Sequence, residues 1–105
     1  MIGIFKKNYV NINAKEALEL IGNEDYQLID VREAYEFESN HIKGAKLIPL
    51  GDITKRLHEI ALDKKVILVC ASGGRSTSAA KYLSEKGYET YNILGGMMAV
   101  NSQTN

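Results

Sequence analysis

The sequence predicts a small α/β domain, in which a mostly parallel β-sheet is flanked by helices. Segments with strand character alternate with segments of helical character along the chain. One strand segment, residues 66–69, has four apolar side chains in a row, as is typical of a strand buried on both faces of a parallel sheet. The length of 105 residues suits one modest core, so we expect a single domain over residues 1–105 with its core at about residues 11–100.

The N-terminal part begins with a weakly alternating segment, residues 9–12, which predicts an edge strand. Asn13 and Glu16 then have the spacing of a capping box, with Asn13 in the place of the usual Ser or Thr. A helical stripe of apolar residues follows, and Gly22 suits the position just past the end of such a helix. Residues 26–31 predict a second strand that is mostly buried.

The middle of the chain shows shorter patterns. Residues 33–38 favour one or two helical turns, and their three glutamates indicate a solvated face. Residues 45–48 predict a short strand that ends at Pro49, the only proline. Asp52 is a suitable N-cap, so a helix is expected from there to about residue 62. The side chains expected to point inward from it are Ile53, Leu57, Ile60 and Ala61.

The C-terminal part is expected to continue the alternation. A helix is predicted from about Ser76, and Gly87 is expected to end it. The inward side of this helix carries Ala79, Ala80 and Leu83. Residues 90–93 predict the last strand, Gly95 and Gly96 a turn, residues 97–100 a final short helix, and residues 102–105 a polar tail.

The composition is ordinary for a soluble globular protein, with 45% hydrophobic and 25% charged residues. Basic and acidic residues balance at 13 each, so the charge gives no support to a nucleic-acid or acidic-membrane partner. Residues 1–7 have no long apolar run after their positive charges, which indicates no secretory signal. No stretch approaches the ~20 apolar residues of a membrane span. A single cysteine cannot form an internal disulfide, and we expect a cytoplasmic protein.

The chain's only cysteine, Cys70, directly follows the predicted central strand. Ligands of parallel sheets bind beyond the carboxyl ends of the strands, which is where Cys70 falls. The residues that lead from it to a helix start are Ala71, Ser72, Gly73, Gly74, Arg75 and Ser76. Backbone N–H groups at a helix N-terminus lack intrahelical partners and favour negative charge. Because the two glycines allow close approach, we expect the amides of residues 71–75 to converge on whatever Cys70 carries.

These surroundings favour a reactive thiolate. A free thiol has a pKa of about 8.5, which helix N-termini and nearby cations lower to about 3.5–7.5. Arg75 adds a permanent positive charge and a planar set of donors. The competing interpretation is a buried structural cysteine with an ordinary Gly-rich loop, which is the more common role of a lone cysteine. The Gly-Gly-Arg sequence and the helix start favour a functional role for Cys70.

Two other kinds of cysteine chemistry lack support in the sequence. A dithiol redox cycle needs a second cysteine, and the chain has one. A Cys–His pair is not indicated, because His41 and His58 are distant in sequence from Cys70. His41 is expected to be a hydrogen-bonded residue of a connector. Catalysis at Cys70 is therefore expected to depend on amides and the helix dipole rather than on a base.

Four segments, in this order and spacing, resemble signatures of one known family. The first is residues 28–32 with residues 36–37, and the second comprises residues 41–42, 44–45 and 48–50. The third is the loop from Cys70 to Ser76, and the fourth is residues 94–96. Over about residues 11–100 the chain thus resembles a single-domain rhodanese, which is a sulfurtransferase.

The resemblance implies a rhodanese-like fold and a two-step reaction. Cys70 attacks the outer sulfur of a donor such as thiosulfate and becomes a persulfide, whose terminal sulfur the loop amides hold. A thiophilic acceptor, such as cyanide, a thiol or a protein thiolate, then removes the sulfur, so ping-pong kinetics are expected. The implied substrate-binding residues are Ala71, Ser72, Gly73, Gly74, Arg75 and Ser76. We expect no cofactor, no metal, no nucleic-acid partner and no membrane.

Two alternative functions remain open from the sequence. The first is a sulfur carrier or binding module that passes sulfur between proteins with little turnover in free solution. The second, less favoured, is a thiolate phosphatase. Phosphatases of that type have five residues between cysteine and arginine, whereas four separate Cys70 from Arg75, and the shorter loop suits one sulfur better than a phosphate.

Asp30 and Arg32 are candidate supporting residues. They flank the end of a predicted strand with opposite charges and could orient the loop or a substrate. An ion pair that fixes the strand end is the favoured interpretation. Met97 and Met98 are expected to pack in the core or at its rim.

Overall fold

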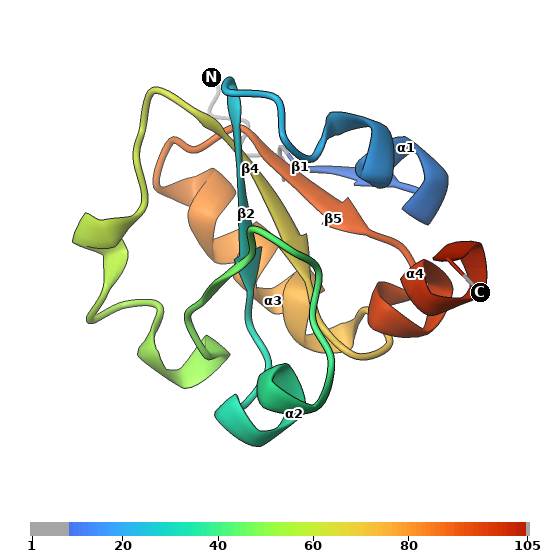
Figure 1. The fold of residues 1–105 in the computed structure, drawn as a ribbon. Coiled ribbons are helices and arrows are strands. Elements are labelled where there is room, and N and C mark those ends of the chain that lie inside the picture. The colour runs from blue at the N-terminus through green and yellow to red at the C-terminus, as the bar shows by residue number, and fades with distance from the viewer. Residues whose placement is uncertain (1–8, 105) are drawn as a thin grey trace.

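The computed structural model describes residues 9–104. Residues 1–7, examined above for a secretory signal, and Asn105 of the predicted polar tail lie outside the described residues. The described chain forms a five-stranded sheet in the order β1-β5-β4-β2-β3, and every pair of neighbouring strands is parallel (Figure 1). The strands are β1 (Tyr9–Ile12), β2 (Tyr26–Asp30), β3 (Lys46–Leu47), β4 (Lys65–Val69) and β5 (Thr90–Ile93). The predicted edge strand and central strand are thus confirmed as β1 and β4.

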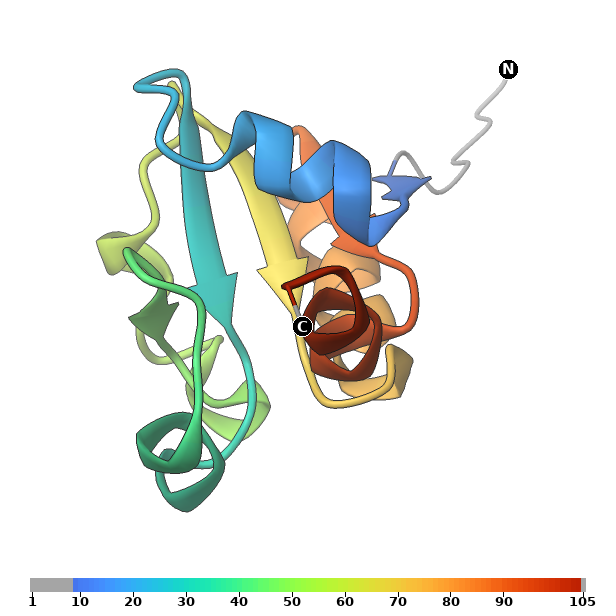
Figure 2. The same ribbon diagram turned by 45° about the vertical axis from the view of Figure 1, so that its right-hand side comes forward.

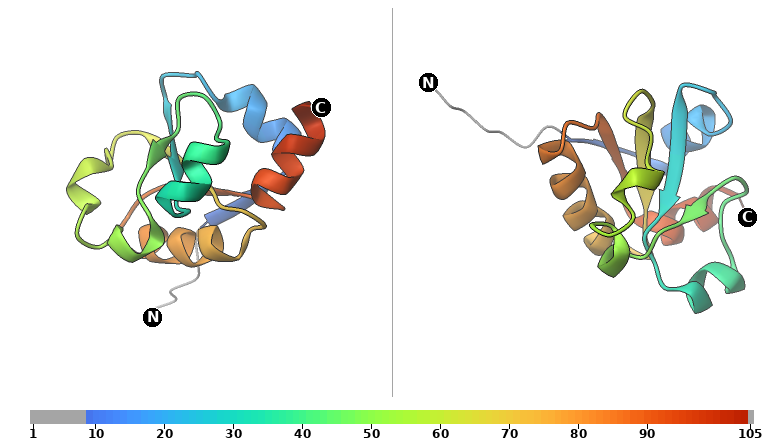
Figure 3. Two further views of the ribbon diagram at one scale, coloured as in Figure 1. Left: turned by 60° about the horizontal axis from the view of Figure 1, so that its bottom comes forward. Right: turned by 90° about the vertical axis from the view of Figure 1, so that its left-hand side faces the viewer.

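Helices cover both faces of this sheet (Figure 2). The helices are α1 (Ala14–Leu20), α2 (Ala34–Ser39), α3 (Gly74–Glu85) and α4 (Gly96–Thr104). α1 and α4 lie together on one face, and α3 covers the other. α2 lies beyond the carboxyl end of β2, as the two views of Figure 3 also show. The predicted α/β fold, with a parallel sheet flanked by helices, is confirmed.

The alternation of side chains along β4 decides where Cys70 points. Val66 and Leu68 pack in the core on the α3 side of the sheet, and Ile67 and Val69 pack in the core on the side of α1 and α4. Successive side chains of a strand point to opposite faces, so Cys70 returns to the α3 side. Cys70 is accordingly part of the α3-side core.

The predicted start and end of the first helix are confirmed. Asn13 Oδ1 accepts a hydrogen bond from the backbone N–H of Glu16 at 2.8 Å. Glu16 Oε1 in turn accepts from the N–H of Asn13 at 2.9 Å, which completes the capping box. Gly22 follows the helix with φ of 99°, a conformation that glycine adopts without strain.

The predicted helix from Asp52 to about residue 62 is wrong. The segment holds two short 3-10 turns, η1 (Leu50–Asp52) and η2 (Leu57–Glu59), and Ala61 is exposed rather than inward. Side chains from elsewhere occupy its backbone groups: Gln27 donates to the Ala61 carbonyl at 2.6 Å and accepts from its N–H at 3.1 Å. Tyr88 donates from its hydroxyl to the Ile60 carbonyl at 2.8 Å. Ile60 is nevertheless buried, as predicted.

Two helix boundaries also differ from expectation. α3 begins at Gly74 rather than near Ser76, with Gly73 as its N-cap at φ of 113°. α4 extends to Thr104 and includes most of the predicted polar tail. Residues 101–104 contain no glycine or proline that would end the helix earlier. Within residues 9–104, no helix combines the length and the apolar character that crossing a membrane requires.

Candidate active site

Cys70 lies at the carboxyl end of β4, the central strand, beneath the loop that leads into α3. The residue is 1% exposed, so its sulfur is covered by the loop and the α3-side core. Of the loop residues, Ser72 and Gly74 are exposed. A reactant must therefore reach the sulfur between loop residues rather than at an open surface.

Two hydrogen bonds hold the Cys70 sulfur. The backbone N–H of Gly73 donates to Sγ at 3.0 Å. Ser76 Oγ lies 3.4 Å from Sγ, where the thiol can donate to the hydroxyl oxygen. Both partners come from the turn that starts α3, because Gly73 adopts the left-handed conformation at the N-cap and Ser76 lies in the first helical turn.

Burial and hydrogen bonding act in opposite directions on the pKa of Cys70. Burial is the largest influence and raises the pKa, because it disfavours the charged thiolate. The Ser76 hydroxyl and the backbone N–H groups of Ser76, Gly73 and Ser72 lower it. The hydrogen bonds together outweigh burial, so the pKa of Cys70 lies below the ordinary value of a thiol. The sequence predicts that the backbone N–H groups of residues 71–75 converge on the sulfur. Of these, the N–H groups of Ser72 and Gly73 act on it, and the N–H group of Ser76, which was not predicted, also does.

The start of α4 fixes the cysteine loop from behind. The N–H of Met97 donates to the Cys70 carbonyl at 2.7 Å, and that of Met98 donates to the Ala71 carbonyl at 3.1 Å. Gly96 lies so close that a Cβ atom there would be 2.3 Å from the Cys70 carbonyl oxygen. The sequence indicated a turn at the two glycines but gave no sign that this turn supports the loop.

Arg75 forms a two-point ion pair with Glu36 of α2. Arg75 Nη1 is 2.7 Å from Glu36 Oε1, and Nη2 is 2.8 Å from Oε2. These bonds, with one from the backbone N–H of Glu33, lower the pKa of Glu36 to about 2. The prediction that the glutamates of this segment form a solvated face is therefore wrong for Glu36, although Glu33 and Glu38 are exposed. Glu36 therefore balances much of the positive charge of Arg75, which does not act on the sulfur alone.

Asp30 and Arg32 form a buried ion pair at the end of β2. Arg32 Nη2 lies 2.8 Å from Asp30 Oδ2, and both residues are at most 6% exposed. The same guanidinium donates to the Asn40 carbonyl at 2.6 Å, just past α2. The favoured interpretation, an ion pair that fixes the strand end, is confirmed. The pair also fixes the end of α2, the helix that carries Glu36.

The other residues singled out in the sequence have structural contacts. His41 stacks on Phe37 with ring centroids 3.8 Å apart, and its Nδ1 is 2.8 Å from the Phe37 carbonyl oxygen. This matches the expected hydrogen-bonded connector residue. Met97 is buried in the core as expected, whereas the expectation that Met98 packs in the core or at its rim is wrong, because Met98 is exposed.

Asn92 of β5 is a polar residue of the site that sequence reasoning missed. It is 2% exposed, and its Oδ1 accepts a hydrogen bond from Ser76 Oγ at 2.5 Å. Asn92 thus contacts the hydroxyl group that contacts the sulfur. The only signal in the sequence was a polar side chain in an otherwise buried strand.

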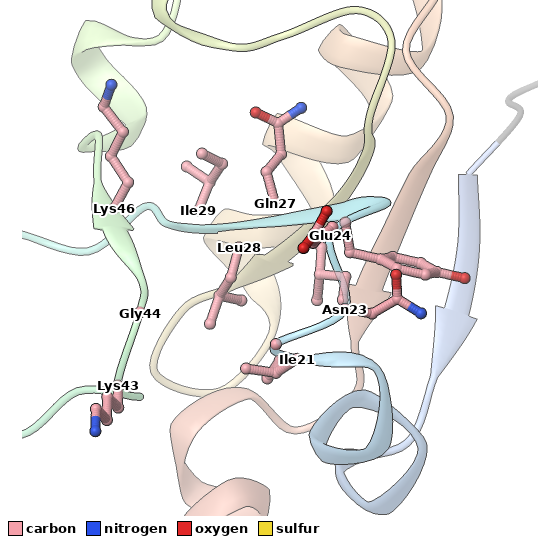
Figure 4. Close-up of a pocket in the computed structure, with 12 residues that line it drawn as sticks. Ile21, Asn23, Glu24, Gln27, Leu28, Ile29, Lys43, Gly44 and Lys46 are labelled. Atoms are coloured by element: carbon pink, nitrogen blue, oxygen red, sulfur yellow. The ribbon is translucent and has the colours of Figure 1, made fainter.

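A cavity of about 690 Å³ lies elsewhere, between the end of α1, β2 and the segment before β3 (Figure 4). Leu28, Gln27 and Lys46 are among the residues that line it, and none of the predicted site residues does. Among the described residues there is also no group of three or more His, Cys, Asp or Glu side chains that could hold a metal ion.

Comparison with known proteins identifies the family. The model of the rhodanese-like domain matches residues 13–103, which is most of the chain. The chain belongs to the rhodanese family. The predicted resemblance is thereby confirmed, and the parallel sheet with a cysteine at the end of its central strand is the rhodanese fold of this chain.

Relatives and solved structures support this membership. A Bacillus subtilis protein named "Putative sulfurtransferase YtwF" is 41% identical over 90 residues, covering 86% of this chain and 85% of that protein. The thiosulfate sulfurtransferase GlpE of Pseudoalteromonas translucida is 33% identical, covering 87% of this chain and 88% of that protein. The crystal structure of a rhodanese-related protein from Thermoplasma volcanium superimposes with a TM-score of 0.84 at 30% identity, covering 90% and 93% of the two chains. Family and relatives together support sulfurtransferase or sulfur-carrier activity.

Proposed function

We propose that this rhodanese is a sulfurtransferase that moves sulfane sulfur from a donor such as thiosulfate to a thiophilic acceptor through a persulfide on Cys70. The observation that carries the proposal is the pair of hydrogen bonds at Cys70 Sγ, one donated by the Gly73 N–H and one shared with the Ser76 hydroxyl. These bonds keep an anion stable in a buried position without a general base.

The reaction has two balanced steps. In the first, the Cys70 thiolate attacks the outer sulfur of thiosulfate, the S–S bond of thiosulfate breaks, and sulfite leaves with the electron pair. Cys70 then carries a persulfide with one negative charge. In the second step, cyanide or a thiolate attacks the terminal sulfur, and the Cys70 thiolate leaves. Each step transfers one neutral sulfur atom between two anions, so neither step needs an external oxidant or reductant.

The loop residues have distinct roles in this proposal. The N–H groups of Ser72, Gly73 and Ser76 stabilise negative charge on sulfur in both the thiolate and the persulfide. Arg75, held by Glu36, ties the first turn of α3 to α2, and Glu36 balances its charge. The start of α4 binds the Ala71 carbonyl and so holds the loop in position above Cys70.

Intact mass measurement after incubation with thiosulfate tests the proposal. We expect a gain of one sulfur atom, no gain in Cys70→Ser, and loss of the gained sulfur when cyanide is added. Because Cys70 is the only cysteine, sulfur bound through a thiol has no other position in the chain. No gain with thiosulfate or any other sulfane donor, or a gain that persists in Cys70→Ser, would overturn the proposal. Hydrolysis of an aryl phosphate that is lost in Cys70→Ser would instead favour the phosphatase alternative.

A carrier that exchanges sulfur mainly with protein partners is the second candidate. Two exposed apolar side chains near the loop favour it: Met98 is 70% exposed beside its hydrogen bond to Ala71, and Tyr35, 74% exposed, precedes Glu36. Such side chains suit protein docking. Slow turnover of thiosulfate and cyanide, together with fast transfer from a persulfidated protein, would favour the carrier. The opposite pattern would favour the small-molecule enzyme.

A further inference from the structure

A chain of hydrogen bonds leads from the buried sulfur to the edge of the sheet. Ser76 Oγ is 3.4 Å from Cys70 Sγ and 2.5 Å from Asn92 Oδ1. Asn92 Nδ2 is 3.0 Å from Oδ1 of Asn11, its register partner on β1. Asn11 is exposed, whereas Ser76 and Asn92 are buried. This series of hydrogen bonds therefore begins at the buried sulfur and ends at a side chain that is exposed to solvent.

The Ser76 hydroxyl group lies in the middle of this series of hydrogen bonds, and it has one proton for several acceptors. While Cys70 is a thiol, its S–H can donate to Ser76 Oγ, and Ser76 donates to Asn92 Oδ1. When Cys70 is a thiolate, the Ser76 proton is needed at the sulfur. Asn92 Oδ1 then loses its donor inside the protein, which is costly for a group that is 2% exposed.

The amide of Asn92 provides a way out of this conflict. Its oxygen and nitrogen have nearly the same size, so a half turn about the Cβ–Cγ bond exchanges the positions of acceptor and donor while the rest of the side chain stays in place. After the turn, Asn92 Nδ2 donates to Ser76 Oγ, and Ser76 donates to the sulfur. Asn92 Oδ1 then faces Asn11, which is exposed and can present its own Nδ2. Thr77 Oγ1, 3.4 Å from Asn92 Nδ2, accepts from the amide as it stands and donates its own proton to the Gly73 carbonyl at 2.7 Å, so Asn11 is the donor that the reversed amide oxygen requires.

We propose that Asn92 is a positioning residue whose amide reverses with the charge of Cys70, so that one hydrogen-bonded chain serves both the protonated and the deprotonated sulfur. The hydrogen bonds of Asn92 go to Ser76, Asn11 and Thr77 rather than to the sulfur, so Asn92 acts on Cys70 through Ser76. The inference deepens the proposed function. Its consequence for turnover rests on the proposed function, whereas the reversal of the Asn92 amide concerns the free thiol and is measured without a sulfur donor.

Other charged groups near Cys70 must stay constant in any test. Arg75 of α3 acts on Cys70 through its charge, and Glu36 of α2 neutralises Arg75. The Asp30–Arg32 pair lies at the end of β2, beside β4. α4 contributes backbone N–H groups and has no titratable side chain, and β5 carries Tyr91, whose hydroxyl is bound to Glu89. None of these groups is changed in the variants below.

A double-mutant cycle on the thiolate titration tests the inference. Asn92→Asp can only accept, so it holds the Ser76 proton away from the sulfur, and we expect the pKa of Cys70 to rise by about one unit or more. In a Ser76→Ala background the path through the hydroxyl is gone, and we expect less than half of that rise. An equal rise in both backgrounds would show a direct charge effect and overturn the inference, as would no rise in either. The titration is followed by ultraviolet absorbance of the thiolate without any sulfur donor.

A second measurement on the unmodified chain covers the case in which Asn92→Asp does not fold. We expect the side-chain amide signals of Asn92 and Asn11 in ¹H–¹⁵N spectra to shift with the same pH midpoint as the Cys70 thiolate. Asn23 is the matched control, since its Oδ1 accepts from Asp25 in a turn away from the sulfur. Unmoved Asn92 signals during the thiolate titration would overturn the reversal. The gain of sulfur from thiosulfate is measured separately by mass, so a failure of the proposed function can be distinguished from a failure of the amide reversal.

Discussion

At Cys70, burial opposes the negative charge that hydrogen bonds favour. A residue that is 1% exposed is a poor place for an anion unless donors point at it. The Gly73 N–H donates to the sulfur, and the Ser76 hydroxyl and the nearby backbone N–H groups favour the thiolate, so the balance lowers the pKa of the thiol. The competing interpretation, an inert structural cysteine, would leave the buried sulfur with a raised pKa.

Replacing Ser76 should weaken the sulfur site without unfolding it. Ser76→Ala removes the side-chain hydrogen bond to Sγ, so the pKa of Cys70 should rise and sulfur uptake from thiosulfate at neutral pH should fall about tenfold. Uptake should recover at higher pH, because the thiolate then forms again. The matched control is Ser84→Ala in the same helix, whose hydroxyl bonds the Lys81 carbonyl instead. Equal uptake rates for the two variants across the pH range would contradict the role of Ser76.

The Glu36–Arg75 pair predicts a specific pH dependence of stability. The pKa of Glu36 is lowered to about 2 in the folded chain from 4.5. The pair therefore stabilises fully above pH 4.5, and its contribution disappears as the pH falls toward 2. Arg75 is partly exposed, so we expect Glu36→Gln to lower the free energy of unfolding by about 0.5–1 kcal/mol at neutral pH.

Denaturant unfolding at several pH values measures this difference. The difference in the free energy of unfolding between the parent chain and Glu36→Gln should disappear as the pH falls from 4.5 to 2. Glu38→Gln, exposed in the same helix, serves as control and should change the free energy of unfolding little. A gap for Glu36→Gln that stays constant down to the lowest pH would show that the ion pair is not its source.

Among the elements, the start of α4 and the cysteine loop depend on each other. The first N–H groups of a helix lack intrahelical partners, and here the carbonyls of Cys70 and Ala71 accept from them. The same bonds hold the Cys70 and Ala71 carbonyls against the start of α4. This arrangement requires a residue without a Cβ at Gly96, which also has φ of 53°.

Gly96→Ala should therefore damage both stability and the site. The added Cβ would lie 2.3 Å from the Cys70 carbonyl oxygen, so the loop or the helix must move. We expect a loss of about 1–3 kcal/mol in the free energy of unfolding and slower sulfur uptake. Gly51→Ala is the control, because nothing lies within 4 Å of a Cβ there and its φ is not positive. Similar stabilities for the two variants, measured by thermal and denaturant unfolding, would contradict the tight contact.

Sequence reasoning succeeded where the cause of structure is local. The capping box of Asn13 and Glu16, the apolar run of β4 and the glycine after α3 all act within a few residues. It failed where distant side chains decide. Gln27 and Tyr88 bind the backbone that was predicted as a helix near Ala61, and no pattern within that segment reveals them.

The candidate site shows the same division. The lone cysteine, the two glycines and the helix start singled out Cys70 and its loop as the candidate site, because the loop is continuous in sequence. Glu36 and Asn92 reach the site from other elements, so their charge and polarity alone gave no indication of their partners. Glu36 was predicted as part of a solvated face for this reason.

At the scale of the whole molecule, the central sheet separates two cores. The α3 side holds Leu68, Leu83 and Cys70, and the other side holds Ile67, Val69 and Met97. Because Cys70 belongs to the α3-side core, packing there supports the loop above it. Stability and the geometry of the sulfur site are therefore linked through α3.

Leu83→Ala should lower stability strongly. Leu83 is fully buried under the sheet, and its truncation should cost about 2–5 kcal/mol in the free energy of unfolding. Leu62→Ala, at a position that is 66% exposed, should change the free energy by less than about 0.5 kcal/mol. Denaturant unfolding of both variants checks the prediction, and a small effect at Leu83 would contradict the assigned core.

The central claim is that the fold stabilises negative charge on the sulfur of Cys70. Its most direct test is the ultraviolet titration of the single thiol in the folded chain and again in urea. We predict a lower titration midpoint in the folded chain, because the loop N–H groups and Ser76 outweigh burial. A folded midpoint equal to or above that of the unfolded chain would contradict the account.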